Sequence, residues 1–183
     1  DDNVHVQTLS GLNIGVSRFN VLVQIPELNQ AYSLWAAADR KGLVYFYDEA
    51  LIERATSSRA DDAIREVESD QPKETDLRYC EVLYRKKEDQ GARYNLIEQL
   101  EDYDYSFEEM EYNPELALVN LREGLKFDRT KPVNNLNHPY VFFSPKCALA
   151  IRAVKYYARL KSTQDNPLME GAHKAVGLMI LTE

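Results

Sequence analysis

The stretch from Arg129 to Gln164 constrains this chain more than any other, because it holds seven Lys and Arg residues and no Asp or Glu. The clearest helix signal of the chain lies inside it. Ser144 suits an N-cap, where its hydroxyl accepts a hydrogen bond from a first-turn N–H, and Pro145 suits the first helical position, which needs no N–H. We therefore predict a helix that begins at Ser144-Pro145 and ends at Lys161.

Apolar residues recur in this predicted helix at intervals of three and four, which is the period of an α-helix. They form an arc wider than a surface helix shows, so we expect the helix to lie against the core. Its remaining face carries cations on one side, and residues 146–161 are called the basic helix. The apolar rows are Cys147, Ile151, Val154 and Ala158, and Leu149, Ala153, Tyr156 and Leu160; the candidate contact residues are Lys146, Arg152, Lys155, Tyr156, Arg159 and Lys161.

An acidic segment, residues 98–115, has the opposite character, with eight Asp and Glu residues and no base. The whole chain has a formal net charge of −8. An acidic protein that keeps one purely basic helix is attracted to anionic surfaces through that helix. The candidate contact residues of the acidic segment are Glu101, Asp102, Asp104, Glu108, Glu109 and Glu111, with Tyr103, Tyr105 and Tyr112 between them.

The length of 183 residues predicts a single domain, residues 1–183, which can bury a core without disulfides or metals. No apolar run is long enough to span a membrane, and no secretory signal opens the chain, so we expect no membrane contact. Cys80 and Cys147 each sit in an apolar pattern and are interpreted as small buried hydrophobes. A cytoplasmic or other intracellular, reducing location is the default expectation.

Residue patterns predict an α+β fold that is predominantly helical, with an N-terminal antiparallel β-meander followed by a helical C-terminal half. In residues 1–47, mostly β, alternation of apolar and polar residues indicates short strands separated by turns. A helix opened by Pro26 interrupts them, and Gly42 follows it as a helix-ending glycine. The expected strands are 4–8, 12–16, 19–25 and 43–47, the turns are Ser10-Gly11 and Ser17-Arg18, and the helix is 26–41.

The patterns after residue 47 predict mostly helices. Residues 48–75 are expected to form a polar helix and loop arm, with Ser58 as the cap of a short helix that carries Ala63, Ile64 and Val67. Residues 76–183 form the helical part. Its expected helices are 77–84, which also fits a strand, 91–107, and two that begin at Asn113-Pro114 and Asn166-Pro167, and residues 140–143 form an apolar lead-in to the basic helix.

No pattern in the sequence assigns catalysis. His5, His138 and His173 lack the spacing of a zinc site, so we predict no metal and no cofactor. Asp102-Tyr103-Asp104 matches the Asp-x-Asp pattern with which some glycosyltransferases hold a metal, but no Gly-rich phosphate loop accompanies it. Cys147 beside Lys146 at a helix start is the one nucleophile worth naming, and its place in the apolar row favours burial instead. No catalytic residue is assigned.

Three classes of function stay open. The first, which we favour, is a non-enzymatic structural or assembly protein of capsid or scaffold type that self-associates, with its basic helix on single-stranded nucleic acid or on a neighbouring subunit's acidic segment. The second is an acidic inhibitor or immunity-type protein that covers a basic site on a partner protein. The third is an enzyme with an unrecognised site. Packing of the acidic segment against the basic helix inside one subunit is the alternative to an external contact.

Overall fold

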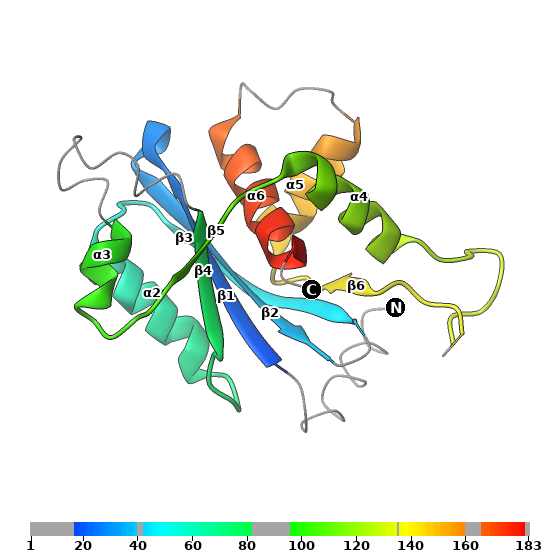
Figure 1. Ribbon diagram of the computed structural model, residues 1–183, viewed down its shortest axis with the longest axis horizontal. Helices are drawn as coiled ribbons and strands as arrows, with labels where there is room; N and C mark the ends of the chain where they lie inside the picture. Colours follow the sequence, from blue (N-terminus) through cyan, green and yellow to red (C-terminus); the bar gives the residue numbers. More distant parts are fainter. Residues whose placement is uncertain (1–16, 40–41, 82–95, 135, 160–165, 182–183) are drawn as a thin grey trace.

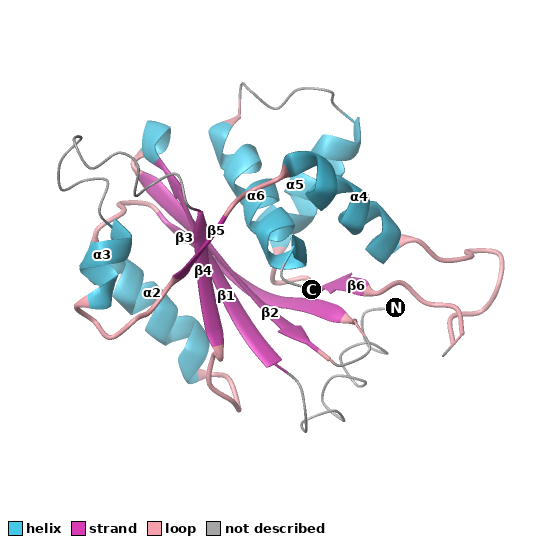
Figure 2. Ribbon diagram, viewed as in Figure 1, coloured by secondary structure: helices cyan, strands magenta, loops and turns pink. Residues whose placement is uncertain are grey.

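A computed structural model describes residues 17–39, 42–81, 96–134, 136–159 and 166–181 of the protein. Within these ranges, six strands form one mixed sheet in the order β5-β4-β1-β2-β3-β6, and helices cover both of its faces (Figures 1 and 2). The strands are β1 Ser17–Ile25, β2 Gln30–Ala38, β3 Val44–Ile52, β4 Leu77–Glu81, β5 Glu108–Met110 and β6 Val141–Phe143. The helices are η1 Pro26–Leu28, α2 Ser57–Ser69, α3 Leu96–Glu101, α4 Pro114–Leu125, α5 Ala148–Arg159 and α6 Pro167–Leu181.

The prediction of a predominantly helical α+β fold is wrong, because the fold is mixed α/β with a six-stranded sheet at its centre. β1, β2 and β3 form an antiparallel meander. The chain then adds strands in parallel: β4 beside β1, β5 beside β4 and β6 beside β3. Residues 76–183 are therefore not a separate helical assembly, because they supply three strands of the same sheet.

The helix predicted at residues 26–41 is a short 3-10 turn followed by β2. Every residue of β2 after Gln30 is buried, because the strand lies between β1 and β3 and both faces of the sheet are covered. A strand buried on both faces does not alternate in polarity, and an Ala-rich one then resembles a helix. The polar helix and loop arm predicted at residues 48–75 is also wrong at its start, since β3 continues to Ile52.

Other boundaries differ from the predictions for local reasons. Residues 77–84 were the ambiguous segment, and Leu77–Glu81 is strand β4. The helix predicted at 91–107 is described as α3 and stops at Glu101, after which Asp104 takes a left-handed backbone, φ 69°, that ends the helix. Ser17-Arg18 begins β1 and is not a turn. The strands predicted at 4–8 and 12–16 lie outside the described residues.

Two cap-and-proline predictions are confirmed. Asn113 accepts a hydrogen bond from the Leu116 amide through its side chain, and α4 begins at Pro114. In the same way Asn166 accepts from the Met169 amide before α6 begins at Pro167. The short helix around Ala63 is also confirmed as α2, although Thr56, and not Ser58, is its cap.

The sheet separates two apolar layers. On one face, α4, α5 and α6 pack on Val21, Val23 and other residues of the central strands. On the other face, α2 and α3 pack on residues that include Trp35 and Leu22. Leu22 points to the face opposite its neighbours Val21 and Val23, and it is buried there because the second face is also covered. Because each helix packs its apolar side on the sheet, the charged sides of α3 and α5 face away from the sheet, on opposite sides of the molecule.

Candidate functional site

The basic helix is described as α5, and it packs on the sheet through Cys147, Ala150 and Ala153, which are fully buried. Arg152 and Lys155 lie on its opposite side and are exposed, as the spacing predicted. Lys146 is exposed just before the helix, and Tyr156 is half-buried. Arg159 belongs to the helical backbone, and Lys161 lies outside the described residues.

The start of α5 differs from the prediction at Ser144-Pro145. Those two residues form a turn in which the Ser144 hydroxyl accepts from the Lys146 amide, and the helix begins at Ala148. Its first amides are bound by a carboxylate from β3: Glu49 accepts from Leu149 N–H at 2.9 Å and from Ala150 N–H at 3.0 Å. Glu49 also accepts from the buried Tyr32 hydroxyl at 2.7 Å. A distant acid therefore anchors the basic helix to the sheet.

The acidic segment runs from α3 through the Asp104 turn to β5 and on to α4. Six candidate residues were predicted there, and the structure places five of them at the surface. Glu109 is the half-buried exception. The exposed ones are Glu101, Asp102, Asp104, Glu108 and Glu111.

The structure separates the basic helix from the acidic residues of α3 and β5. α3 packs on one face of the sheet and α5 on the other. β5 is one edge strand, whereas α5 is anchored to β3, next to the opposite edge strand β6 (Figure 1). The ion pairs found among the described side chains do not include Arg152 or Lys155. The alternative in which the two charged surfaces pack on each other inside one subunit is not what the described residues show.

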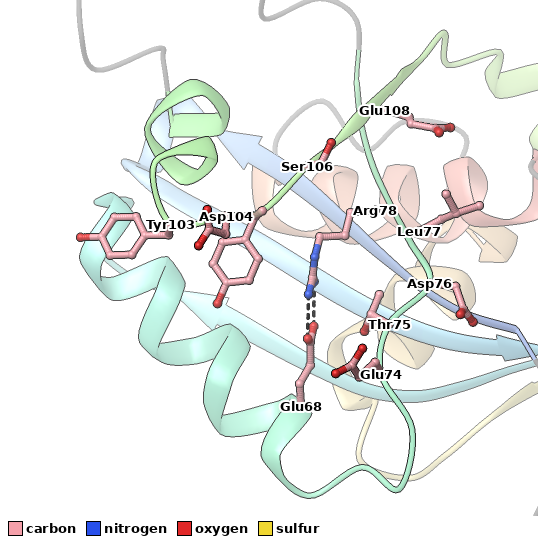
Figure 3. Close-up of a pocket in the computed structure, with 11 residues that line it drawn as sticks. Glu68, Glu74, Thr75, Asp76, Leu77, Arg78, Tyr103, Asp104, Ser106 and Glu108 are labelled. Carbon is pink, nitrogen blue, oxygen red and sulfur yellow. Dashed lines mark hydrogen bonds and ion pairs between the residues drawn. The ribbon is translucent and has the colours of Figure 1, made fainter.

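A pocket of about 560 Å³ lies within reach of the acidic segment (Figure 3). Three stretches of chain form it: the end of α2, the entry into β4, and the turn between α3 and β5. Its lining is Glu68, Glu74, Thr75, Asp76, Leu77, Arg78, Tyr103, Asp104, Tyr105, Ser106 and Glu108. Only Asp104 and Glu108 among these were predicted as site residues, because the pocket combines segments that are far apart in sequence.

Arg78 is held at the centre of this pocket. Its guanidinium donates to both carboxylate oxygens of Glu68 at 2.7 Å and to Asn20 Oδ1 at 3.0 Å. It also lies 4.8 Å from the ring centroid of Tyr105. Glu68 in turn accepts from the Trp35 indole N–H at 2.9 Å. This bidentate pair neutralises its own charges within the lining of the pocket.

A second polar cluster lies at the carboxyl end of β4. The Lys174 ammonium of α6 is 3.1 Å from Oε2 of Glu81, whose side chain is only 5% exposed. The ammonium also lies 5.8 Å from the ring centroid of Tyr112. Carboxyl ends of parallel strands are a common place for ligands. Among the described residues, however, no group of three His, Cys, Asp or Glu side chains could hold a metal ion.

His173, the residue before Lys174, is buried, and burial lowers its pKa to about 4. An unfolded histidine titrates near pH 6.5, so between these values the unfolded chain binds the proton that the fold excludes. Stability should therefore fall as pH drops from about 6.5 to 4, by up to ~3 kcal/mol from this residue. We expect His173→Gln to flatten the pH dependence of the unfolding free energy in that window.

The control for this pH prediction is His138→Gln. His138 is half-buried beside Pro139 and Tyr140, and this variant measures how much of the change comes from replacing a histidine by glutamine elsewhere in the chain. Urea unfolding at four or five pH values measures both variants. An unchanged slope in His173→Gln would contradict the assignment.

Both cysteines are buried, as predicted, and they are not joined in a disulfide. Burial, followed by the negative charges of Glu49 and Asp48, raises the pKa of Cys147. The thiolate is therefore disfavoured, and Cys147 is not suited to act as a nucleophile.

His5 lies outside the described residues, so the structure does not relate it to the other histidines.

A scan against protein-family models finds no match, and searches of curated proteins and of solved structures find none. No helix in the described ranges is long and apolar enough to cross a membrane.

Proposed function

We propose that this chain is a non-enzymatic assembly protein, a subunit of scaffold or capsid type, whose basic helix α5 contacts the acidic segment of a neighbouring copy. The observation that carries the proposal is the position of the two charged surfaces. The acids of α3 lie on the face of the sheet opposite α5, and those of β5 lie on the edge strand far from β3 and β6, where α5 is anchored. Two complementary surfaces that are separated within one chain suit a head-to-tail contact between chains.

Such a contact is heterologous, because each copy presents its helix to one neighbour and its acidic segment to another. It generates a ring if the rotation between copies closes, and a filament if it does not. Charge complementarity sets the rate of encounter and the register, and apolar contacts add affinity. Exposed apolar side chains are available for such contacts: Leu77 and Tyr103 lie near the acids, and Leu136 and Tyr140 lie on the segment that leads into β6.

The proposal is tested by the mass of the purified protein in solution, measured by light scattering at low and high salt. We expect a mass above one chain, 21.1 kDa, that falls toward it as salt increases. Arg152→Ala with Lys155→Ala should reduce the mass at low salt, because it removes both exposed cations of α5. Arg122→Ala with Lys126→Ala removes the same charge from an exposed position of α4 and from the exposed residue that follows the helix, and it serves as the matched control.

A short single-stranded RNA added to the same samples distinguishes the other uses of the basic helix. If the mass rises with RNA, and this rise is lost in the Arg152 and Lys155 variant, the partner of the basic helix is nucleic acid and not a neighbouring chain. A monomer at every salt concentration that ignores RNA would contradict the proposal. In that case the acidic inhibitor becomes the better hypothesis, because the pocket lies beside the acidic segment and offers a site for a basic partner.

A further inference from the structure

The pocket in Figure 3 has an excess of negative charge that the described part of the chain leaves unbalanced. Its lining contains five carboxylates and one guanidinium. Arg78 is paired with Glu68, so four carboxylates remain. One of these, Asp76, accepts from the backbone N–H of Arg18, and no described cation pairs with Glu74, Asp104 or Glu108. A cation placed among them would be strongly favoured.

The apolar residues that line the pocket indicate which kind of cation would bind there. Tyr103 and Tyr105 provide aromatic surface, and Leu77, which is 38% exposed, provides aliphatic surface. An ammonium or guanidinium on a long hydrocarbon stem satisfies both features, because its stem packs on apolar groups while its head meets carboxylates and ring faces. Arg78 and Glu68 are already paired, so the incoming head group binds the other acids of the pocket and leaves that pair intact.

We propose that the pocket receives the side chain of Arg152 or Lys155 from the α5 helix of a neighbouring copy. This inference rests on the proposed assembly, and it identifies the pocket as the place where the basic helix of the neighbour binds; we call this contact the socket. The two side chains are exposed and lie three residues apart, so they project from one side of α5 about one turn apart. Within one chain α5 lies on the far face of the sheet from the pocket, so the side chain must come from another copy.

A pair of matched variants separates a specific socket from general attraction between opposite charges. Asp104→Asn with Glu108→Gln removes two acids from the pocket, and Asn suits position 104 because its backbone is left-handed, φ 69°. Asp102→Asn with Glu111→Gln makes the same two chemical changes in the acidic segment, at exposed residues outside the pocket. Thermal unfolding confirms that both variants fold.

The readout is the dissociation constant of self-association at low salt, from a concentration series. We expect the pocket variant to weaken self-association about tenfold or more and the control to weaken it less than about threefold. Equal weakening by both variants would overturn the socket and leave the proposed assembly in place. A wild-type chain that is monomeric at every concentration would overturn both.

Mixing provides the second readout. The pocket variant keeps an intact α5, and the variant Arg152→Ala with Lys155→Ala keeps an intact pocket. Each alone should stay largely monomeric. Mixed at equal concentrations, they should form complexes of two chains, twice 21.1 kDa, that do not grow further, since only one helix-to-pocket contact is left. A mixture that forms no complex would overturn the one-helix-to-one-pocket contact.

Discussion

Glu49→Ala should lower the free energy of unfolding by roughly 3 to 4 kcal/mol, the combined loss of an N-terminal helix cap and of a buried hydroxyl's partner. Glu49 accepts hydrogen bonds from Leu149 N–H, Ala150 N–H and the Tyr32 hydroxyl. Alanine leaves the first-turn amides of α5 without their carboxylate and removes a negative charge from the positive end of the helix. It also leaves the Tyr32 hydroxyl, which is fully buried, without its acceptor.

The measurement for Glu49→Ala is urea unfolding at neutral pH, with Glu49→Gln as the control. Glutamine keeps the shape of the side chain and one acceptor oxygen, so it should lose less than half as much stability. Because α5 carries Arg152 and Lys155, Glu49→Ala should also weaken self-association under conditions where the chain stays folded. A loss of stability below about 1 kcal/mol would show that the carboxylate is not the anchor of α5.

The sequence predicted those elements whose signals are local. Asn113-Pro114 and Asn166-Pro167 open helices because the cap and the proline act within one turn, whatever the rest of the chain does. The exposure of Arg152 and Lys155 follows from the same kind of information, since spacing on a helix sets which side chains share a side. Ser144-Pro145 has the same signature and still failed, because Glu49, about 100 residues away, binds the first amides of a helix that begins later.

The sheet was missed because the signal of a central strand is weak. β2 carries Tyr32 and Trp35 on opposite faces, and both are fully buried, so no alternation marks it as a strand. β4 is similar, with Tyr79 in one apolar layer and Cys80 in the other. Its parallel partner β1 lies some 58 residues earlier, and periodicity within a window of the sequence contains nothing about such a pairing.

The candidate site divides along the same line. The acidic segment and the basic helix are runs of residues, and the sequence predicts both. The pocket is formed where α2, β4 and the turn at Asp104 meet. Its central pair, Arg78 and Glu68, is only ten residues apart in sequence, but the two side chains face each other only because the sheet places β4 beside α2. Neither residue stands out in the sequence, since charged residues are ordinarily exposed to solvent.

Lys174→Met should be at least as destabilising, by about 3 to 5 kcal/mol, because it leaves the buried Glu81 carboxylate without its cation. The Lys174 ammonium is 3.1 Å from Glu81 Oε2, and the two side chains are 21% and 5% exposed. Methionine matches the length of the lysine stem, so packing against Tyr112 is largely kept and the loss reports on the charge.

The double variant, Lys174→Met with Glu81→Gln, decides whether the unpaired charge is the cause. Glutamine removes the charge and keeps the shape, so the double variant should recover most of the stability that Lys174→Met loses, and denaturant unfolding of all four proteins gives the coupling energy. A double variant as unstable as the single one would mean that the loss comes from packing. Buried pairs of this kind are often no more stable than apolar residues of the same size, so recovery to the wild-type value or above it is compatible with a pair that mainly fixes how α6 sits on β4.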